Sequence, residues 1–187
     1  MQATSERTTA PALQAMLKEG ALAGAWIMDP HRSSVRLKAW HLGSLGQVNG
    51  VFHDLSGHVT ISPGGEVTGT VTVAAASIDT NNARRDTHLR SKAFLDSDNY
   101  PDITYTVDRM ELSDHRVVLT GTATVRDCTR PLSIDASASV HGDGEISLDA
   151  EMAINRADFG LTWNVLGIPS MNVILSIHAV LTWRGDR

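Results

Sequence analysis

Hydrophobic and polar side chains alternate along most of the chain from Trp26 onward. In residues 132–140, for example, Leu132, Ile134 and Val140 share one parity, whereas Asp135 and the serines occupy the other. Successive side chains of a β-strand point to opposite faces, so this pattern predicts strands with one apolar and one wet face. Such strands are typical of antiparallel sheets. The alternation recurs in residues 35–39, 67–73, 103–107, 117–125, 146–154 and 173–183.

One further run, residues 47–62, changes parity part-way: Phe52 stands at an even position, whereas Val59 stands at an odd one. A shift of one residue turns every later side chain to the opposite face of a sheet. We therefore predict a bulge or tight turn near Asp54–Gly57. If the run is counted as one broken strand, the sequence predicts eight strands.

Eight strands of this kind either pack as a sandwich or close into a barrel. Closure removes exposed strand edges, and eight strands leave room for packed side chains or for one small ligand. Only 5% of the residues are aromatic, so few bulky groups are available to fill the interior. We favour a barrel with a cavity, and a barrel with a filled core remains the alternative.

Two segments depart from the strand pattern. Residues 79–96 read as a helical insert with Thr80 or Asn81 as the N-cap. In residues 1–24, Leu13 and Leu17 recur at helical spacing, which predicts a short helix. This segment is either a cap or partner-binding arm or, as we favour, a loose extension. We therefore divide the chain into a partly helical or disordered extension, residues 1–24, and a barrel domain, residues 25–187.

The net charge and the lengths of the apolar segments indicate which partners and which cellular compartment to expect. A net charge of −5 and a pI of about 5.8 provide no general basic field for nucleic acid. The best early apolar run, Ala21–Met28, is far shorter than the roughly 20 residues of a membrane-spanning helix. No basic segment followed by a long apolar run marks a secretory signal. We expect a cytoplasmic protein.

Motifs that carry enzyme chemistry are missing from the sequence. It contains no G-x-S-x-G, H-E-x-x-H, phosphate-binding loop or dinucleotide-binding motif. The single Cys128 excludes an intramolecular disulfide and a multi-cysteine metal site. His41, His53, His58 and His88 would bind a metal only if folding gathered them, and no pair has the spacing of strand neighbours on one face. We expect no catalytic residues, no metal and no required cofactor.

Two other segments could contribute to a ligand site. Residues 84–92 hold four basic side chains against Asp86. They could bind an anionic head group through Arg84, Arg85, His88 and Arg90, although we favour a solvated helix pinned by salt bridges. Residues 155–171 form an apolar stretch interrupted by glycine and proline. This stretch is either a lid over an apolar entrance or a strand and plug that complete the core.

Four stretches share a pattern with a known group of proteins. They are residues 26–31 with 41–43 and 48–52, the run S-I-D-T-N-N-A-R-R-D-T-H-L-R-S at 77–91 with 94–96 and 100–101, residues 119–132, and residues 154–161. Together they resemble the YceI-like family of lipid-binding barrel proteins. Departures at Asp127-Cys128 and at residues 163–171 leave the position of the ligand entrance open.

The resemblance implies an elongated, lipocalin-like antiparallel barrel with a helix at one end. It also implies that the lumen holds one polyisoprenoid-type chain, such as an isoprenoid quinone or a polyprenyl lipid. No catalytic residues carry over from the family. Six residues match motif positions of the family: Arg85, Asp86, Leu89, Arg156, Asp158 and Phe159. We expect them mainly to hold the helix and the final hairpin in place.

These observations predict a non-catalytic carrier or sequestering protein for a long apolar molecule. A filled barrel with a structural or interaction role is the alternative, followed by an enzyme using a histidine cluster. The expected partner is a lipophilic small molecule rather than nucleic acid, and transient membrane contact and a homodimer stay open. The expected ligand-contacting residues are Val35, Leu37, Phe52, Val71, Val73, Leu89, Phe94, Tyr105, Leu119, Leu148, Met152, Phe159, Trp163, Leu175 and Ile177.

Overall fold

A computed structural model describes residues 10–41, 46–113, 116–163 and 169–185 of the chain. Its helices are α1 (Ala10–Lys18) and α2 (Ala83–Arg90), with short 3₁₀ turns η1 (Ala75–Ser77), η2 (Gly142–Gly144) and η3 (Arg156–Phe159). The strands are β1 (Gly24–Met28), β2 (Ser34–His41), β3 (Gly46–Phe52), β4 (Leu55–Ile61), β5 (Val67–Ala74), β6 (Ile78–Asp79), β7 (Asp102–Ser113), β8 (Arg116–Val125), β9 (Cys128–His141), β10 (Glu145–Asn155) and β11 (Pro169–Trp183).

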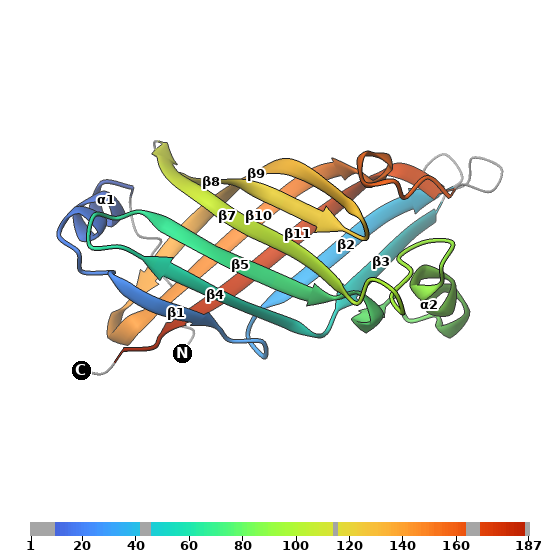
Figure 1. The fold of residues 1–187 in the computed structure, drawn as a ribbon, viewed down its shortest axis with the longest axis horizontal. Helices are drawn as coiled ribbons and strands as arrows, with labels where there is room; N and C mark the ends of the chain where they lie inside the picture. The colour runs from blue at the N-terminus through green and yellow to red at the C-terminus, as the bar shows by residue number, and fades with distance from the viewer. Residues whose placement is uncertain (1–9, 42–45, 114–115, 164–168, 186–187) are drawn as a thin grey trace.

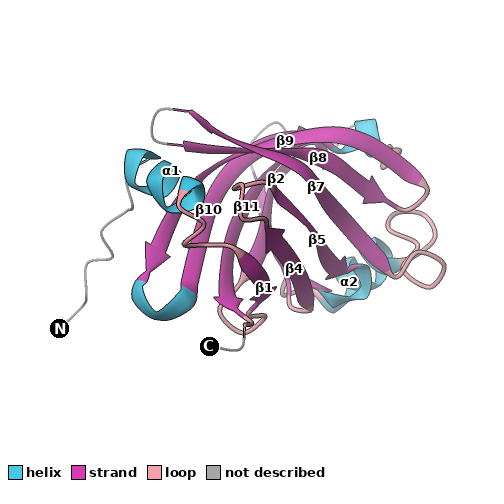
Figure 2. Ribbon diagram, turned by 60° about the vertical axis from the view of Figure 1, so that its left-hand side comes forward, coloured by secondary structure: helices cyan, strands magenta, loops and turns pink. Residues whose placement is uncertain are grey.

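The sheet closes on itself because β1 pairs with both β4 and β11. The ring runs β1-β4-β5-β7-β8-β9-β10-β11 and returns to β1, and every pairing in it is antiparallel. Trp26 lies opposite Trp183 at the closing seam. The predicted all-β, eight-stranded antiparallel barrel is therefore confirmed, and Figure 2 shows the strands wrapping around a common axis.

Strand β11 has two partners along one edge. Residues near its C-terminal end pair with β1, whereas residues from Pro169 to His178 pair with β2. Strand β3 pairs with β2, and β6 pairs with the end of β3. The predicted break in residues 47–62 is thus real: β3 ends at Phe52, β4 begins at Leu55, and the two halves pair with different strands.

A second change of parity, which the sequence pattern did not reveal, occurs in β7. The register with β8 shifts between Val107 and Arg109, so Val107 and Met110 both point inward although their numbers differ in parity. Gly121 lies opposite Val107 at this shift. A Cβ atom built on Gly121 would lie 1.9 Å from the carbonyl oxygen of Thr106. Only glycine allows this close approach of β7 and β8.

The two helices lie at opposite ends of the barrel (Figure 1). Helix α2 occupies part of the predicted insert 79–96, and its N-cap is Asn82, whose side chain accepts from the Arg85 amide at 3.0 Å. The sequence-based choice of Thr80 or Asn81 was wrong, because the Thr80 hydroxyl donates to the buried Asp86 carboxylate instead. No helix among the described residues is long and apolar enough to cross a bilayer.

Helix α1 packs against the barrel through its apolar stripe. Leu13 and Leu17 are only 5% and 7% exposed and belong to the main hydrophobic core, with Met16 partly buried beside them. The outward-facing Gln14 and Lys18 are exposed. Residues 10–18 therefore form a packed helix rather than the loose extension that we favoured from the sequence.

Candidate ligand-binding cavity

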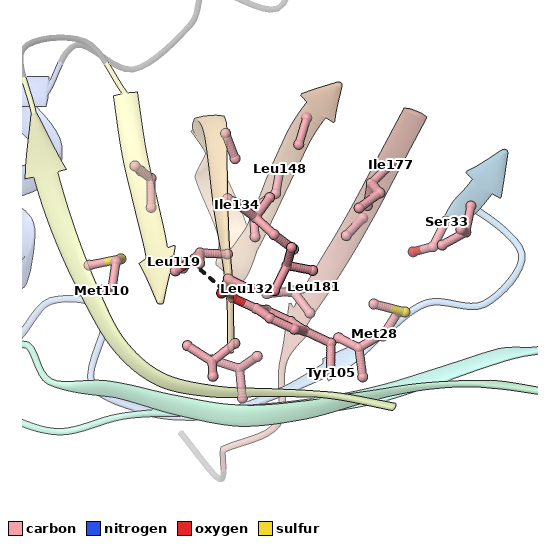
Figure 3. A pocket seen from close by; sticks show the side chains of 18 of the residues that line it. Met28, Ser33, Tyr105, Met110, Leu119, Leu132, Ile134, Leu148, Ile177 and Leu181 are labelled. Carbon is pink, nitrogen blue, oxygen red and sulfur yellow. Dashed lines mark hydrogen bonds between the residues drawn. The ribbon is translucent and has the colours of Figure 1, made fainter. Parts of the chain in front are cut away.

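A cavity of about 230 Å³ lies inside the barrel. Side chains from every strand of the closed ring contribute to it, and Figure 3 shows those that are labelled converging on a common space. Each strand of the ring contributes at least one lining residue, for example, in ring order, Met28, Leu55, Val73, Val107, Val117, Ile134, Ile146 and Leu181. The cavity is therefore a product of barrel closure and not of any single hairpin.

Strand parity and small side chains explain why the lumen is apolar and partly empty. The inward positions of β9 and β10 carry the apolar residues of the alternating pattern. Several of these positions hold alanine, including Ala136, Ala138 and Ala150, with Ala179 on β11. Because alanine fills little volume, the wall leaves space at the centre instead of closing on itself. The structure thus differs from the alternative of a filled core.

Tyr105 is the largest polar group in the lining. Its hydroxyl donates to the carbonyl oxygens of Leu119 at 2.9 Å and Leu132 at 3.2 Å, as Figure 3 illustrates for one of them. Burial, and secondarily the charge of Asp108, raises the pKa of Tyr105 to about 12. Ser33 also borders the cavity, and its hydroxyl oxygen accepts from the Val180 amide at 3.0 Å. These polar groups are engaged with the wall, so the lining suits a hydrocarbon.

Ten of the residues predicted to contact a ligand line this cavity. Their role as ligand contacts remains a prediction, but they share the same enclosed space. They are Val35, Val71, Val73, Tyr105, Leu119, Leu148, Met152, Phe159, Leu175 and Ile177.

The other five predicted residues do not line the cavity. Phe52 is buried in the core, and Leu37, Leu89 and Phe94 pack against it. Trp163 is 38% exposed, and the centre of its ring lies 4.1 Å from that of His88, with the two ring planes tilted by 52°. Parity alone could not separate Leu37 from the lining, because it shares a face of β2 with Val35, and only Val35 reaches the cavity.

Sequence reasoning missed the contribution of the N-terminal segment to the lining. Leu13, Leu17 and Leu22 all border the cavity, although they precede the alternating strands. The helical spacing of Leu13 and Leu17 predicted the helix. It did not predict that the helix borders the lumen, because nothing local indicates where a short amphipathic helix will pack.

The residues proposed for a head group lie at the α2 end and do not line the cavity. Arg85 donates through Nε to the Thr80 hydroxyl at 2.7 Å and through a terminal nitrogen to the Thr80 carbonyl at 2.8 Å. Arg90 donates to the Ile78 carbonyl at 2.5 Å. Arg84 is exposed, and the His88 ring contacts the Trp163 ring. These contacts tie α2 to the segment before it.

The buried Arg156 side chain makes similar contacts near η3, including one with the ring of Phe94. The Arg156 guanidinium lies 5.5 Å from the centre of the Phe94 ring and donates to the carbonyl of Ser170 at 3.0 Å and to that of Leu161. Burial lowers the pKa of Arg156. Phe159 borders the lumen, and Leu161 is buried. The interpretation of 155–171 as a lid or plug cannot be followed through 164–168, which lie outside the described residues.

The histidines do not form a metal centre in the described parts of the chain. Nε2 of His53 lies 3.4 Å from the Asp79 carboxylate, His58 is exposed on β4, and the His88 ring contacts the Trp163 ring. No group of three His, Cys, Asp or Glu side chains arranged for a metal was found in these ranges. Cys128 is half-buried, and its thiol faces the Asp158 carbonyl at 3.4 Å.

Comparison with known proteins identifies the family to which this barrel belongs. The model of the YceI-like domain matches residues 26–181. The chain belongs to the YceI-like family. It is 31% identical to Protein YceI of Shigella flexneri over 156 residues, which span 78% of this chain and 80% of that protein. Protein YceI of Salmonella arizonae matches with the same identity and the same coverage.

Solved structures of YceI-like and related barrels have the same fold. BcnA of Burkholderia cenocepacia superposes with a TM-score of 0.73 at 18% identity, covering 82% of this chain and 98% of BcnA. A polyisoprenoid binding domain from Saccharophagus degradans gives 0.71 at 16% identity, covering 85% and 98%. The Campylobacter jejuni YCEI protein gives 0.65 at 26% identity, covering 76% and 88%. Helix α1 lies outside the residues that the family model matches.

Proposed function

We propose that this protein binds one apolar chain of the polyisoprenoid type in its lumen and carries or sequesters it without catalysis. The observation that carries the proposal is the cavity of about 230 Å³, lined by aliphatic side chains from all strands of the ring. Such a space excludes water from a hydrocarbon and offers it close contacts on every side. A prenyl quinone or a polyprenyl lipid has the required apolar chain.

The energetics favour hydrocarbon over polar ligands. Burying a methylene group contributes about 0.8 kcal/mol, so even a short prenyl chain provides a substantial gross gain. Drug-sized ligands retain only about 0.3 kcal/mol per heavy atom, and affinity will lie well below the gross sum. No Lys, Arg, Asp or Glu occurs among the described lining residues, so a charged group in the lumen would lose its hydration without an ionic partner.

Family membership and fold support the same proposal. One structural neighbour is described as a polyisoprenoid binding domain, and it has the same barrel as this chain. Three polar side chains of the described lining have partners: Tyr105 and Ser33 contact the backbone of the wall, and Nδ1 of His178 lies 2.7 Å from the Asp149 carboxylate. The other described lining residues are apolar apart from Thr104, and apolar side chains provide no nucleophile or general base.

Native mass spectrometry of the full chain tests the proposal. Freshly purified protein, or protein incubated with prenyl quinones of graded chain length, should carry one hydrocarbon ligand of discrete mass. The variant Ala150→Phe, which fills the lumen, should carry less. If neither co-purified lipid nor uptake of any added prenyl compound is detected, the proposed function is wrong.

A further inference from the structure

Helix α1 forms one end of the cavity although it lies outside the family-matched residues 26–181. Leu13 and Leu17 from α1, and Leu22 from the connector that follows, border the lumen and are almost fully buried. The helix sits at the end of the barrel opposite α2 (Figure 1). The volume available to a ligand at this end is therefore set by side chains that are not part of the matched domain.

Apolar contact holds α1 in this position. The side chain of Leu17 covers the β4–β5 turn, where a Cβ atom built on Gly65 would lie 3.3 Å from the Leu17 Cβ. Among the described residues, no hydrogen bond joins α1 to a strand. The first firm attachment is Leu22, whose carbonyl accepts from the Trp26 indole at 2.9 Å. Gly20, with a φ of 69°, lies between the helix and this attachment.

The seated helix limits how far a ligand extends at this end of the lumen. Leu13 and Leu17 border the same space as the strand residues and are buried there. A chain that reaches past this point must take the room that Leu13 and Leu17 occupy.

We propose that Leu13 and Leu17 of α1 determine the length of the chain that the lumen accepts. The inference rests on the proposed function, because it concerns the same cavity and the same class of ligand. With α1 seated, the apolar chain ends against the two leucines. A chain that extends beyond them displaces the leucines, and the apolar contacts that hold α1 to the barrel are lost.

Competition among prenyl alcohols tests this directly. The full chain is incubated with equal concentrations of alcohols containing two, three and four isoprene units, and the bound fractions are measured by native mass spectrometry. The double variant Leu13→Ala/Leu17→Ala should shift the ratio of bound four-unit to bound two-unit chain at least tenfold toward the four-unit chain relative to the wild type, equivalent to about 1.4 kcal/mol.

The matched control changes the exposed face of the same helix. Gln14→Ala/Lys18→Ala should keep the wild-type preference, because both side chains point away from the lumen. Each single leucine variant should shift the ratio part-way, which keeps the test valid if the double variant does not fold. Thermal unfolding establishes which variants are folded.

One result would overturn the inference while leaving the proposed function in place: a folded leucine variant that binds the prenyl alcohols but keeps the wild-type ratio. If the wild-type protein binds none of the alcohols, the proposed function itself fails, and the length determinant fails with it.

Discussion

The Tyr105 hydroxyl donates to the Leu119 carbonyl oxygen at 2.9 Å, which ties β7 to the neighbouring strand β8 along the inner wall of the barrel. A second contact, to Leu132 at 3.2 Å, extends the tie to β9. A hydroxyl buried among aliphatic side chains would be unfavourable without such acceptors. The pair thus fixes the orientation of the one tyrosine that borders the cavity among the described residues.

Tyr105 should make stability depend on pH in the alkaline range. Burial raises its pKa to about 12 from the ordinary value of 10.0, so the folded state holds the phenol proton more tightly than the unfolded chain. The resulting stabilisation is complete below pH 10 and is lost as the pH rises toward 12. Tyr105→Phe should flatten the fall in the midpoint of thermal unfolding over this range.

Absorbance titration of tyrosinate provides the readout. The chain has only two tyrosines, Tyr100 and Tyr105, so each can be assigned by removing the other. Tyr105→Phe should abolish the late step near pH 12, and Tyr100→Phe should retain it. A late step that survives in Tyr105→Phe would show that the phenol is not held as described.

Filling the lumen should block ligand uptake. Ala150 lines the cavity, whereas Ala153 on the same strand is exposed. An apolar cavity of about 150 Å³ accommodates one benzene molecule, so the ring of Ala150→Phe should take up a large part of the cavity of about 230 Å³. Uptake of a prenyl quinone by Ala150→Phe should fall at least tenfold, while Ala153→Phe should bind as the wild type does. Equal uptake by the two variants would place the ligand elsewhere.

The contact between β7 and β8 at Gly121 should not tolerate a methyl group. A Cβ there would meet the Thr106 carbonyl oxygen at 1.9 Å, and both residues belong to paired strands whose backbones cannot move apart without loss of pairing. Gly121→Ala should therefore destabilise the fold by about 3 kcal/mol or more, or prevent folding. Gly142→Ala, where nothing lies within 4 Å, is the control and should stay within about 0.5 kcal/mol of the wild type in urea unfolding.

The buried carboxylate of Asp86 should be essential to the α2 end. Asp86 is 5% exposed and accepts from both the amide and the hydroxyl of Thr80, the former at 3.0 Å. Asp86→Ala leaves these donors without their acceptor and should cost about 2–3 kcal/mol. Thr87→Ala, an exposed change on the same helix, should cost much less. Comparable losses for the two variants in urea unfolding would contradict this assignment.

Much of the fold could be predicted because inward and outward residues alternate strictly. Leu148 and Met152 on β10, and Leu175 and Ile177 on β11, reach the lumen as their parity predicts. The break before Leu55 was also predictable, since a change of parity must have a structural cause.

Other features depend on tertiary contacts that parity does not report. The shift after Val107 was hidden because Asp108 and Arg109 are both charged, and β1 was too short to give a clear pattern. The positions of Leu89 and Phe94 follow from the way α2 packs rather than from strand alternation. For the same reason, the burial of Leu17 against the β4–β5 turn could not be predicted from its helical spacing alone.

Since β11 supplies the partner edge for both β1 and β2, neither seam can form until residues 169–183 have been synthesised. During translation the nascent sheet therefore has two unpaired strand edges, and such edges are templates for aggregation. The pairing of Trp26 with Trp183 joins positions near opposite ends of the family-matched domain, so it is among the slowest contacts to form by chain diffusion. Growth conditions that slow release of the C-terminal strand should lower the yield of folded protein more than changes that affect any internal hairpin.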